Sequence, residues 1–156
     1  MTVIKPFGEP GTLARLLHAL LVLESEDDRD TLVWMVAECG VQPMPCSTLR
    51  EAKSLLPSHS IGLAFCEQQL SDGDYREFLG TVRSSQRPIP VVVCARELDL
   101  SLYLDAMELG AYDFIVGPYQ KADVAWIVEG ALWQVAGTRL EHPPAGTGAG
   151  GRLYEH

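Results

Sequence analysis

The feature that most constrains the fold is an alternation of five short apolar runs with stretches of helical character. The apolar runs are residues 20–23, 41–46, 61–66, 91–94 and 114–116. Uninterrupted runs such as VVVC are typical of strands that are covered on both faces, as in a parallel sheet. Helices are predicted over residues 28–38, 48–55, 75–84, 101–109 and 122–134. This alternation predicts a doubly wound α/β domain with a five-stranded parallel sheet.

Residues that favour helix ends agree with this pattern. Gly40 and Gly110 follow two of the predicted helices, at the position where a left-handed C-terminal cap favours glycine. Ser47, Asp74 and Asp99 precede three others as candidate N-caps. Local signals at both kinds of helix end therefore support the predicted order of elements.

Composition divides the 156-residue chain into one domain and two flanking segments. We expect a single domain over residues 19–137, which is long enough to bury a core, and an N-terminal extension over residues 1–18. The tail, residues 138–156, is rich in Gly and Pro and poor in apolar residues, so we expect it to be disordered. We expect no DNA-binding or catalytic output domain after the tail.

Charge and hydropathy exclude several classes of partner. The formal net charge is -9 and the pI is about 4.8, which argues against phosphate backbones and anionic membranes, because Lys and Arg supply the affinity for both. No apolar run approaches the roughly 20 residues of a spanning helix, and the first residues do not resemble a secretion signal. We therefore expect a cytoplasmic protein that binds neither nucleic acid nor membrane.

The cysteines are not spaced for metal or redox chemistry. Cys39, Cys46, Cys66 and Cys94 are far apart and form no C-x-x-C pair, which is the usual sign of a zinc site. Cys66 and Cys94 end apolar runs, where a reduced cysteine behaves as a small buried hydrophobe. We interpret these cysteines as structural.

Candidate site residues stand at the carboxyl ends of the predicted strands, where open parallel sheets bind ligands. The residues at these ends are Glu24 and Ser25, Glu67, Ala95 and Arg96, and Gly117 and Pro118. The first end lies within LLVLESEDDRD, in which an apolar run leads directly into a group of acids. Such a loop repels phosphate, so a nucleotide or flavin-phosphate site is excluded.

Several stretches of the chain resemble the receiver domain of bacterial two-component response regulators. LLVLESEDDRD resembles the first strand and its acidic loop, and IGLAFCEQQLSDGD resembles the third strand, the phosphoacceptor and the following turn. RPIPVVVCAR resembles the fourth strand, and AMELGAYDFIVGPY resembles the approach to the fifth strand and its Lys-Pro. The resemblance implies a flavodoxin-like sheet with strand order 2-1-3-4-5. It also implies a non-enzymatic role in a bacterial signalling or transcription pathway.

The chemistry of that family needs groups that this chain lacks. In the family, two acids and an acceptor Asp bind magnesium, while a Thr or Ser and a Lys contact the phosphoryl oxygens. Here the acid pair falls on Glu24 and Ser25, the acceptor on Glu67, the hydroxyl on Ala95 and the lysine on Gly117. Ser25 removes a metal-binding charge, and Glu67 is one methylene too long for an in-line nucleophile. Ala95 and Gly117 provide neither a donor nor a cation.

These departures predict a pseudo-receiver with a vestigial phosphoryl pocket, no catalytic residue and no cofactor. Weak magnesium binding at Glu24 and Glu67 stays open. We interpret the acids of residues 26–30 as a solvated helix start, where the helix dipole favours carboxylates. The predicted function is a phosphorylation-independent protein-interaction module.

Three alternatives remain. The chain could be an active magnesium-dependent phosphoryl acceptor that uses Glu67 or a displaced acid such as Asp72. Glu67 could imitate a phosphorylated Asp, although the hydroxyl and amine on which such a mimic acts are absent. The strand-end cleft could also bind a small molecule, since Ala95 and Gly117 leave it roomy.

The last predicted helix suggests self-association. Val124, Ile127, Val128, Ala131 and Leu132 fall on one stripe that should face the sheet, which places Trp126 and Trp133 together on the outer face. Tryptophan is a typical interface anchor, and the resemblance implies a symmetric dimer face over residues 101–134. We predict a homodimer whose interface includes Trp126, Trp133, Phe114 and Tyr112.

Overall fold

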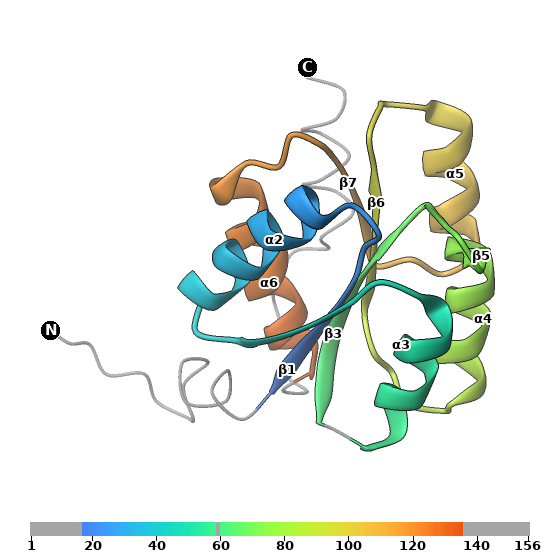
Figure 1. Ribbon diagram of the computed structural model, residues 1–156, viewed down its shortest axis with the longest axis horizontal. Helices are drawn as coiled ribbons and strands as arrows, with labels where there is room; N and C mark the ends of the chain where they lie inside the picture. The colour runs from blue at the N-terminus through green and yellow to red at the C-terminus, as the bar shows by residue number, and fades with distance from the viewer. Residues whose placement is uncertain (1–16, 59, 136–156) are drawn as a thin grey trace, which may run out of the picture.

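The computed structural model describes residues 17–58 and 60–135, which form a parallel sheet covered by helices on both faces (Figure 1). The sheet has five strands in the order β2-β1-β3-β6-β7, and its neighbouring strands are all parallel. The strands are β1 (His18–Val22), β2 (Gln42–Cys46), β3 (Ile61–Glu67), β6 (Val91–Ala95) and β7 (Asp113–Val116). The predicted fold class and strand order are confirmed.

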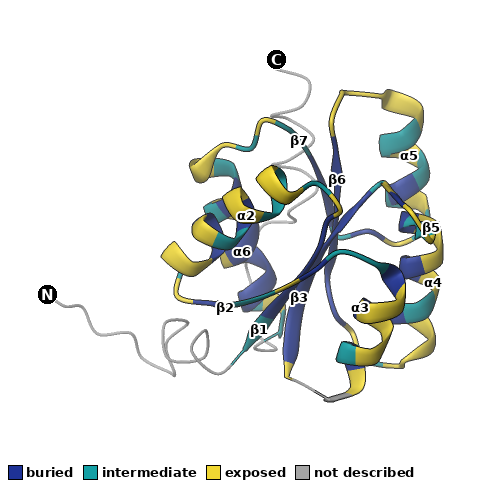
Figure 2. Cartoon of the chain, in the orientation of Figure 1, coloured by how far each residue is buried: buried dark blue, intermediate teal, exposed yellow. Residues whose placement is uncertain are grey.

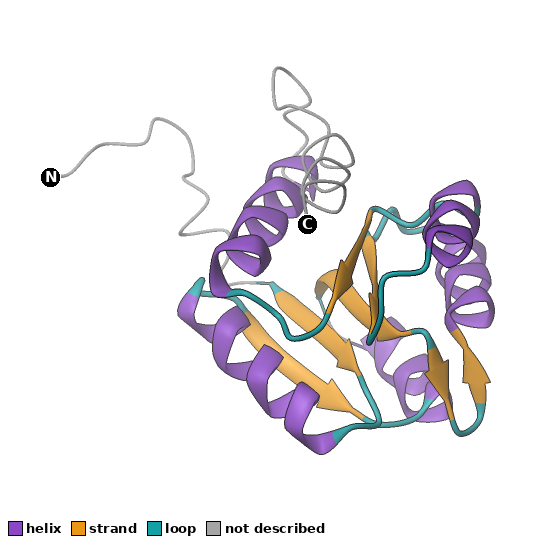
Figure 3. Ribbon diagram, turned by 90° about the horizontal axis from the view of Figure 1, so that it is seen from above, coloured by secondary structure: helices purple, strands orange, loops and turns teal. Residues whose placement is uncertain are grey.

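The helices form two layers. One face of the sheet carries the α2–α6 layer, which consists of α2 (Glu26–Glu38) and α6 (Lys121–Val135). The other face carries the α3–α4–α5 layer, which consists of α3 (Leu49–Leu55), α4 (Tyr75–Ser84) and α5 (Leu100–Glu108). A short 3-10 helix, η1 (Leu56–Ser58), continues α3. Figure 3 shows helices on both sides of the strands.

The inner strands are largely apolar because each of their faces is buried against one helical layer, whereas the edge strand β2 keeps Gln42 and Pro45 exposed (Figure 2). In β1, Leu20 and Val22 pack toward the α3–α4–α5 layer, whereas Ala19 and Leu21 pack toward the α2–α6 layer. Successive side chains of a strand point to opposite faces, so both faces must be apolar when both are covered.

The predicted helix ends are largely confirmed. Gly40 and Gly110 have φ of 87° and 103°, values that glycine adopts readily, and Asp74 and Asp99 are N-caps of α4 and α5. The candidate N-cap Ser47 is wrong by one residue, because Thr48 accepts the capping bond from the backbone N–H of Glu51 at 3.1 Å.

Two features were not predicted. A two-stranded antiparallel hairpin, β4 (Gln69–Leu70) and β5 (Gly73–Asp74), follows β3. Strand β1 begins at His18, inside the expected N-terminal extension. Residues 1–16 of that extension, and the tail over residues 138–156, lie outside the described residues. No helix in the described part of the chain has the length and apolarity needed to cross a membrane.

Candidate functional site

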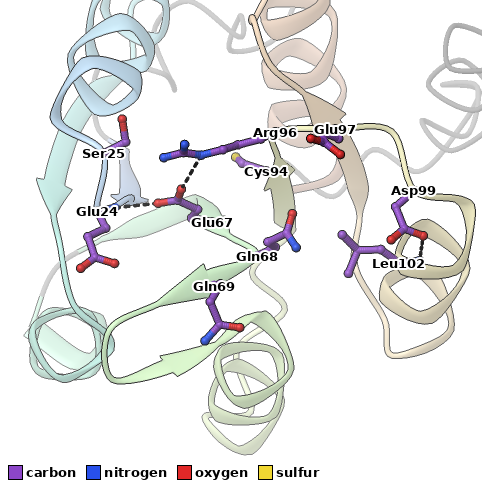
Figure 4. A pocket seen from close by; sticks show the side chains of 10 residues that line it. All are labelled: Glu24, Ser25, Glu67, Gln68, Gln69, Cys94, Arg96, Glu97, Asp99 and Leu102. Carbon is purple, nitrogen blue, oxygen red and sulfur yellow. Dashed lines mark hydrogen bonds and ion pairs between the residues drawn. The ribbon is translucent and has the colours of Figure 1, made fainter.

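A cleft lies beyond the carboxyl ends of the strands, where the sequence placed the candidate site. Its volume is about 530 Å³, and its lining residues are Glu24, Ser25, Glu67, Gln68, Gln69, Cys94, Arg96, Glu97, Asp99 and Leu102 (Figure 4). An adjoining cavity of about 360 Å³ shares Ser25 and Arg96 with it and also contacts Ala95 and Gly117. The fold thus gathers all the candidate pocket residues around two neighbouring cavities that share lining residues.

Glu67 lies at the centre of this cleft and is only 8% exposed. Its Oε1 accepts a hydrogen bond from the backbone N–H of Glu24 at 2.8 Å. Its Oε2 lies 3.8 Å from Nε of Arg96, whose side chain reaches across the cleft (Figure 4). The buried carboxylate is therefore satisfied within the chain, as the cost of burying a charge requires.

Glu24 does not join Glu67 in a pair of carboxylates. The backbone N–H of Glu24 bonds to Glu67, whereas its side chain points away from the Glu67 carboxylate (Figure 4). No group of three or more acidic, His or Cys side chains is placed to hold a metal ion within the described ranges. The weak magnesium binding expected at this pair stays a prediction.

Ser25 has a structural role, although the resemblance to receiver domains places it at the position of a metal-binding acid. Its Oγ accepts a hydrogen bond from the backbone N–H of Asp28 at 3.3 Å, so Ser25 is the N-cap of α2. The first turn of α2 contains Glu26, Asp27 and Asp28, and the positive end of the helix dipole favours carboxylates there. The acidic loop is thus a capped helix start, as predicted.

Ala95 and Gly117 lie side by side at the ends of β6 and β7. The N–H of Gly117 donates to the carbonyl of Ala95 at 2.9 Å, and the Gly117–Pro118 peptide is cis. The ring of Tyr119 lies 3.7 Å from the point that a side-chain carbon on Gly117 would occupy. This half of the cleft therefore offers a phosphoryl group neither a hydroxyl nor an amine from these two positions.

Cys94 lines the 530 Å³ cleft at the end of β6 and is fully buried. Burial raises the pKa of its thiol well above the ordinary value, and the nearby Glu67 carboxylate raises it further. A thiol that stays protonated is a poor nucleophile and a poor metal ligand. Cys46 and Cys66 are buried too, with thiol pKa values raised chiefly by burial, in agreement with a structural role.

Asp72, the alternative acceptor, faces another part of the fold. Its Oδ1 accepts the backbone N–H of Leu49 at 2.9 Å, and its Oδ2 accepts that of Arg50 at 3.0 Å. These hydrogen bonds lower the pKa of the Asp72 carboxyl. Asp72 does not line the 530 Å³ cleft, so its position indicates an anchor for the start of α3.

The residues predicted for a dimer face differ in exposure. Phe114 is 1% exposed and meets the ring of Tyr103 edge to face, with ring centroids 5.6 Å apart. Its inclusion among interface side chains is wrong, because both faces of the sheet are covered and Phe114 belongs to the core. Trp126 is 39% exposed, and Trp133 and Tyr112 are partly exposed.

Arg96 is the site residue that sequence reasoning missed. The sequence places Arg96 at the end of the fourth strand but suggests no role for it, because the resemblance to receiver domains puts the cation of the site at position 117. Its side chain is 70% exposed yet lies beside the buried Glu67. A buried acid and an arginine, each directly after a predicted strand, are a signal that could have suggested the pair.

No protein-family model matches the sequence. The response regulator protein PilR of Pseudomonas aeruginosa is 24% identical over 127 residues, which are 81% of this chain and 27% of PilR. The transcriptional regulatory protein FixJ of Bradyrhizobium diazoefficiens is 24% identical over 117 residues, which are 75% of this chain and 57% of FixJ. This chain therefore spans little more than half the length of that relative. The expectation that no output domain accompanies the domain stays a prediction.

Solved structures share the fold. The receiver domain of a LuxO repressor protein from Vibrio parahaemolyticus matches 80% of this chain and 95% of its own, with a TM-score of 0.73 and 18% identity. The beryllofluoride-activated NtrC4 receiver domain dimer matches 76% of this chain and 98% of its own, with a TM-score of 0.71 and 21% identity. The described residues thus have the fold of response regulator receiver domains.

Proposed function

We propose that this chain is a pseudo-receiver, a protein-interaction module of a signalling pathway that works without accepting a phosphoryl group. The observation that carries the proposal is the engagement of the Glu67 carboxylate. One oxygen accepts a backbone hydrogen bond from Glu24, and the other lies beside Arg96. Both oxygens thus have partners within the chain, and the glutamate side chain is one methylene longer than the aspartate of the family, which displaces the nucleophile from the position that in-line attack requires.

The rest of the cleft supports the same proposal. Ser25 is used as a helix cap, and Ala95 and Gly117 have no side-chain group that stabilises charge on a transferring phosphoryl. Arg96 supplies a cation near the site, but its guanidinium already pairs with Glu67. The polar side chains of Ser25, Glu67 and Arg96 therefore already have partners within the chain.

Treatment with acetyl phosphate and magnesium, or with beryllium fluoride, tests the proposal. We expect the intact mass and the amide NMR spectrum of the wild type to stay unchanged. The matched control is the variant Ser25→Asp/Glu67→Asp/Ala95→Thr/Gly117→Lys, which restores the family's groups at the four positions. A stable adduct on the wild type, or widespread shifts around Ala95, would show an active acceptor instead.

We also propose that the module is a homodimer that associates through the outer face of α6. Trp126 and Trp133 are seven residues apart on that helix and both keep exposed surface, so they lie one above the other. The buried stripe predicted for α6 is confirmed, since Val124, Ile127 and Val128 are at most 1% exposed. Large apolar side chains that a helix leaves at the surface favour association.

Light scattering on the wild type and on Trp126→Ala/Trp133→Ala tests the dimer. We expect a dimeric wild type at micromolar concentration, without any phosphodonor, and a monomeric double variant. Trp34→Ala is the matched control, because it also removes an exposed tryptophan but from α2. A monomeric wild type, or a dimer that both α6 substitutions leave intact, would contradict the proposal.

The cleft volume favours a second candidate function, the sensing of a small molecule. A cavity of about 530 Å³ falls within the roughly 300–1,000 Å³ typical of ligand pockets. Leu102 and the amides of Gln68 and Gln69 contribute apolar and polar surface. A screen of small polar metabolites by NMR, with Gln68→Ala and Leu102→Ala as blocking variants, distinguishes a sensor from a module that uses its surface alone.

A further inference from the structure

The outer face of α2 presents an aromatic ring among carboxylates. Trp34 is 53% exposed, although the opposite side of the helix is buried in the core. Asp27 and Asp30 lie seven and four positions before Trp34, and Glu38 lies four positions after it. All three acidic residues are exposed. Residues at these spacings share one face of a helix. We call Asp27, Asp30, Trp34 and Glu38 the α2 face.

A cation from the same chain already binds one end of the α2 face. Nζ of Lys121, at the start of α6, lies 5.1 Å from the centroid of the Trp34 ring and 3.5 Å from Oε1 of Glu38. One amine thus contacts an aromatic ring and a carboxylate together. Both contacts favour a cation, the first through the ring quadrupole and the second through opposite charge.

The other end of the α2 face has the same chemistry without a cation. Asp27 and Asp30 form no salt bridge with any described residue. They lie on the side of Trp34 that leads to the helix N-terminus, away from Glu38 and Lys121. A second cation placed there would meet a carboxylate next to the indole ring.

We infer that the α2 face docks a basic peptide segment of a partner protein, with an arginine or lysine of that segment placed against Trp34. The inference deepens the proposed interaction role and rests on it. Arginine suits this position, because its planar guanidinium stacks on aromatic rings and pairs with carboxylates. A second copy of this face is a poor occupant, since its carboxylates would meet carboxylates.

The α2 face is also rigid enough to act as a preformed surface. Leu32, Met35 and Val36 anchor α2 to the core and are at most 8% exposed, and Ser25 caps its first turn. A preformed surface loses little freedom on binding, which favours affinity for a flexible partner segment. Tryptophan is the residue type most often found to dominate such contacts.

Fluorescence anisotropy of a labelled helical peptide built from Ala and Arg tests the inference, with the same peptide in Glu and Ala as the negative probe. We expect Trp34→Ala to weaken binding of the basic peptide at least about tenfold. Asp27→Asn/Asp30→Asn should weaken it more than Glu51→Gln/Glu108→Gln does. The second pair removes the same charge from exposed positions of α3 and α5, so it measures attraction by net charge alone.

A reciprocal variant sharpens the test. Lys121→Gln frees the ring and Glu38, so we expect tighter binding than in Lys53→Gln, which removes an equal charge from α3. No measurable binding, equal effects of the two charge pairs, or an unaltered Trp34→Ala would overturn the inference. These assays need no phosphodonor, so their failure is separate from a failure of the pseudo-receiver proposal, which the adduct experiment decides.

Discussion

The two helical layers of the molecule are stabilised differently. In the α3–α4–α5 layer, polar side chains connect one element to the next. The connections are Asp72 to the start of α3, Lys53 to Glu77, Tyr75 and Arg76 to Asp105, and Arg83 to the carbonyl of Leu109. In the α2–α6 layer, Lys121 pairs with Glu38 across the helices, and the outer surface presents Trp34 and Trp126.

We expect this difference to separate residues that stabilise the fold from residues that bind a partner. Both layers pack apolar side chains against the sheet. The hydrogen bonds and ion pairs named above add further support between the elements of the α3–α4–α5 layer, and the Lys121–Glu38 pair adds to the packing of the α2–α6 layer. Exposed aromatic side chains contribute less to folding than buried ones and present apolar surface to other molecules. Substitutions in the first layer should therefore change stability, and those on the surface of the second should change binding.

The largest expected contrast is between two aromatic truncations. Phe78 of α4 is fully buried and Trp34 of α2 is 53% exposed. Phe78→Ala should reduce the free energy of unfolding by about 3–5 kcal/mol. Trp34→Ala should reduce it by less than about 1 kcal/mol, which covers the loss of its contact with Lys121. Urea unfolding followed by circular dichroism measures both, and similar losses would remove the distinction between the layers.

A smaller effect is expected from one hydroxyl group of the supporting layer. Tyr75 is 3% exposed, and its hydroxyl donates to the Asp105 carboxylate of α5. Tyr75→Phe should cost about 1–2 kcal/mol of stability, because the hydrogen bond has a charged acceptor. Tyr112→Phe, at a partly exposed tyrosine near β7, is the control. Equal losses of unfolding free energy in the two variants would show that the hydrogen bond between Tyr75 and Asp105 does not stabilise the fold.

The Asp72 anchor should depend on pH. The backbone N–H groups of Leu49 and Arg50 lower the pKa of Asp72 below its ordinary 3.8, so the folded state favours the carboxylate. The resulting stability is present above pH 3.8 and is lost as the pH falls through the lower pKa of the folded state. Asp72→Asn should thus be less stable than the wild type at neutral pH, by a margin that narrows in acid. Urea midpoints over this pH range measure the margin, and a constant margin would contradict the assignment.

Magnesium should have the smallest effect, because the cleft at the carboxyl ends of the strands does not bring the carboxylates of Glu24 and Glu67 together. Glu67 is engaged by Glu24 and Arg96, and the Glu24 side chain points elsewhere. A single site at a hundredfold excess over its dissociation constant would add about 2.7 kcal/mol of stability. We expect millimolar magnesium to leave the melting temperature nearly unchanged. A rise of several degrees that Glu24→Gln abolishes would reveal a working metal site.

The sequence predicted the order and approximate bounds of the main elements because their signals are local. The helix at Tyr75–Ser84 was predicted with its observed bounds. Its cap at Asp74 and the glycines after α2 and α5 were predicted as well. Apolar periodicity and capping act over a few residues along the chain. The hairpin of β4 and β5 was missed because strands of two residues leave no apolar pattern.

By itself, the sequence determined which chemical groups the strand ends can offer, since the side chains at positions 25, 67, 95 and 117 do not depend on the fold. The tertiary structure alone decided how those groups are used. Glu67 accepts a hydrogen bond from a residue 43 positions away, and Asp72 accepts one from the start of α3, 23 positions away. Hydrogen bonds form only when donor and acceptor come within about 3 Å in good alignment, and contacts so distant in sequence depend on how the strands and helices pack.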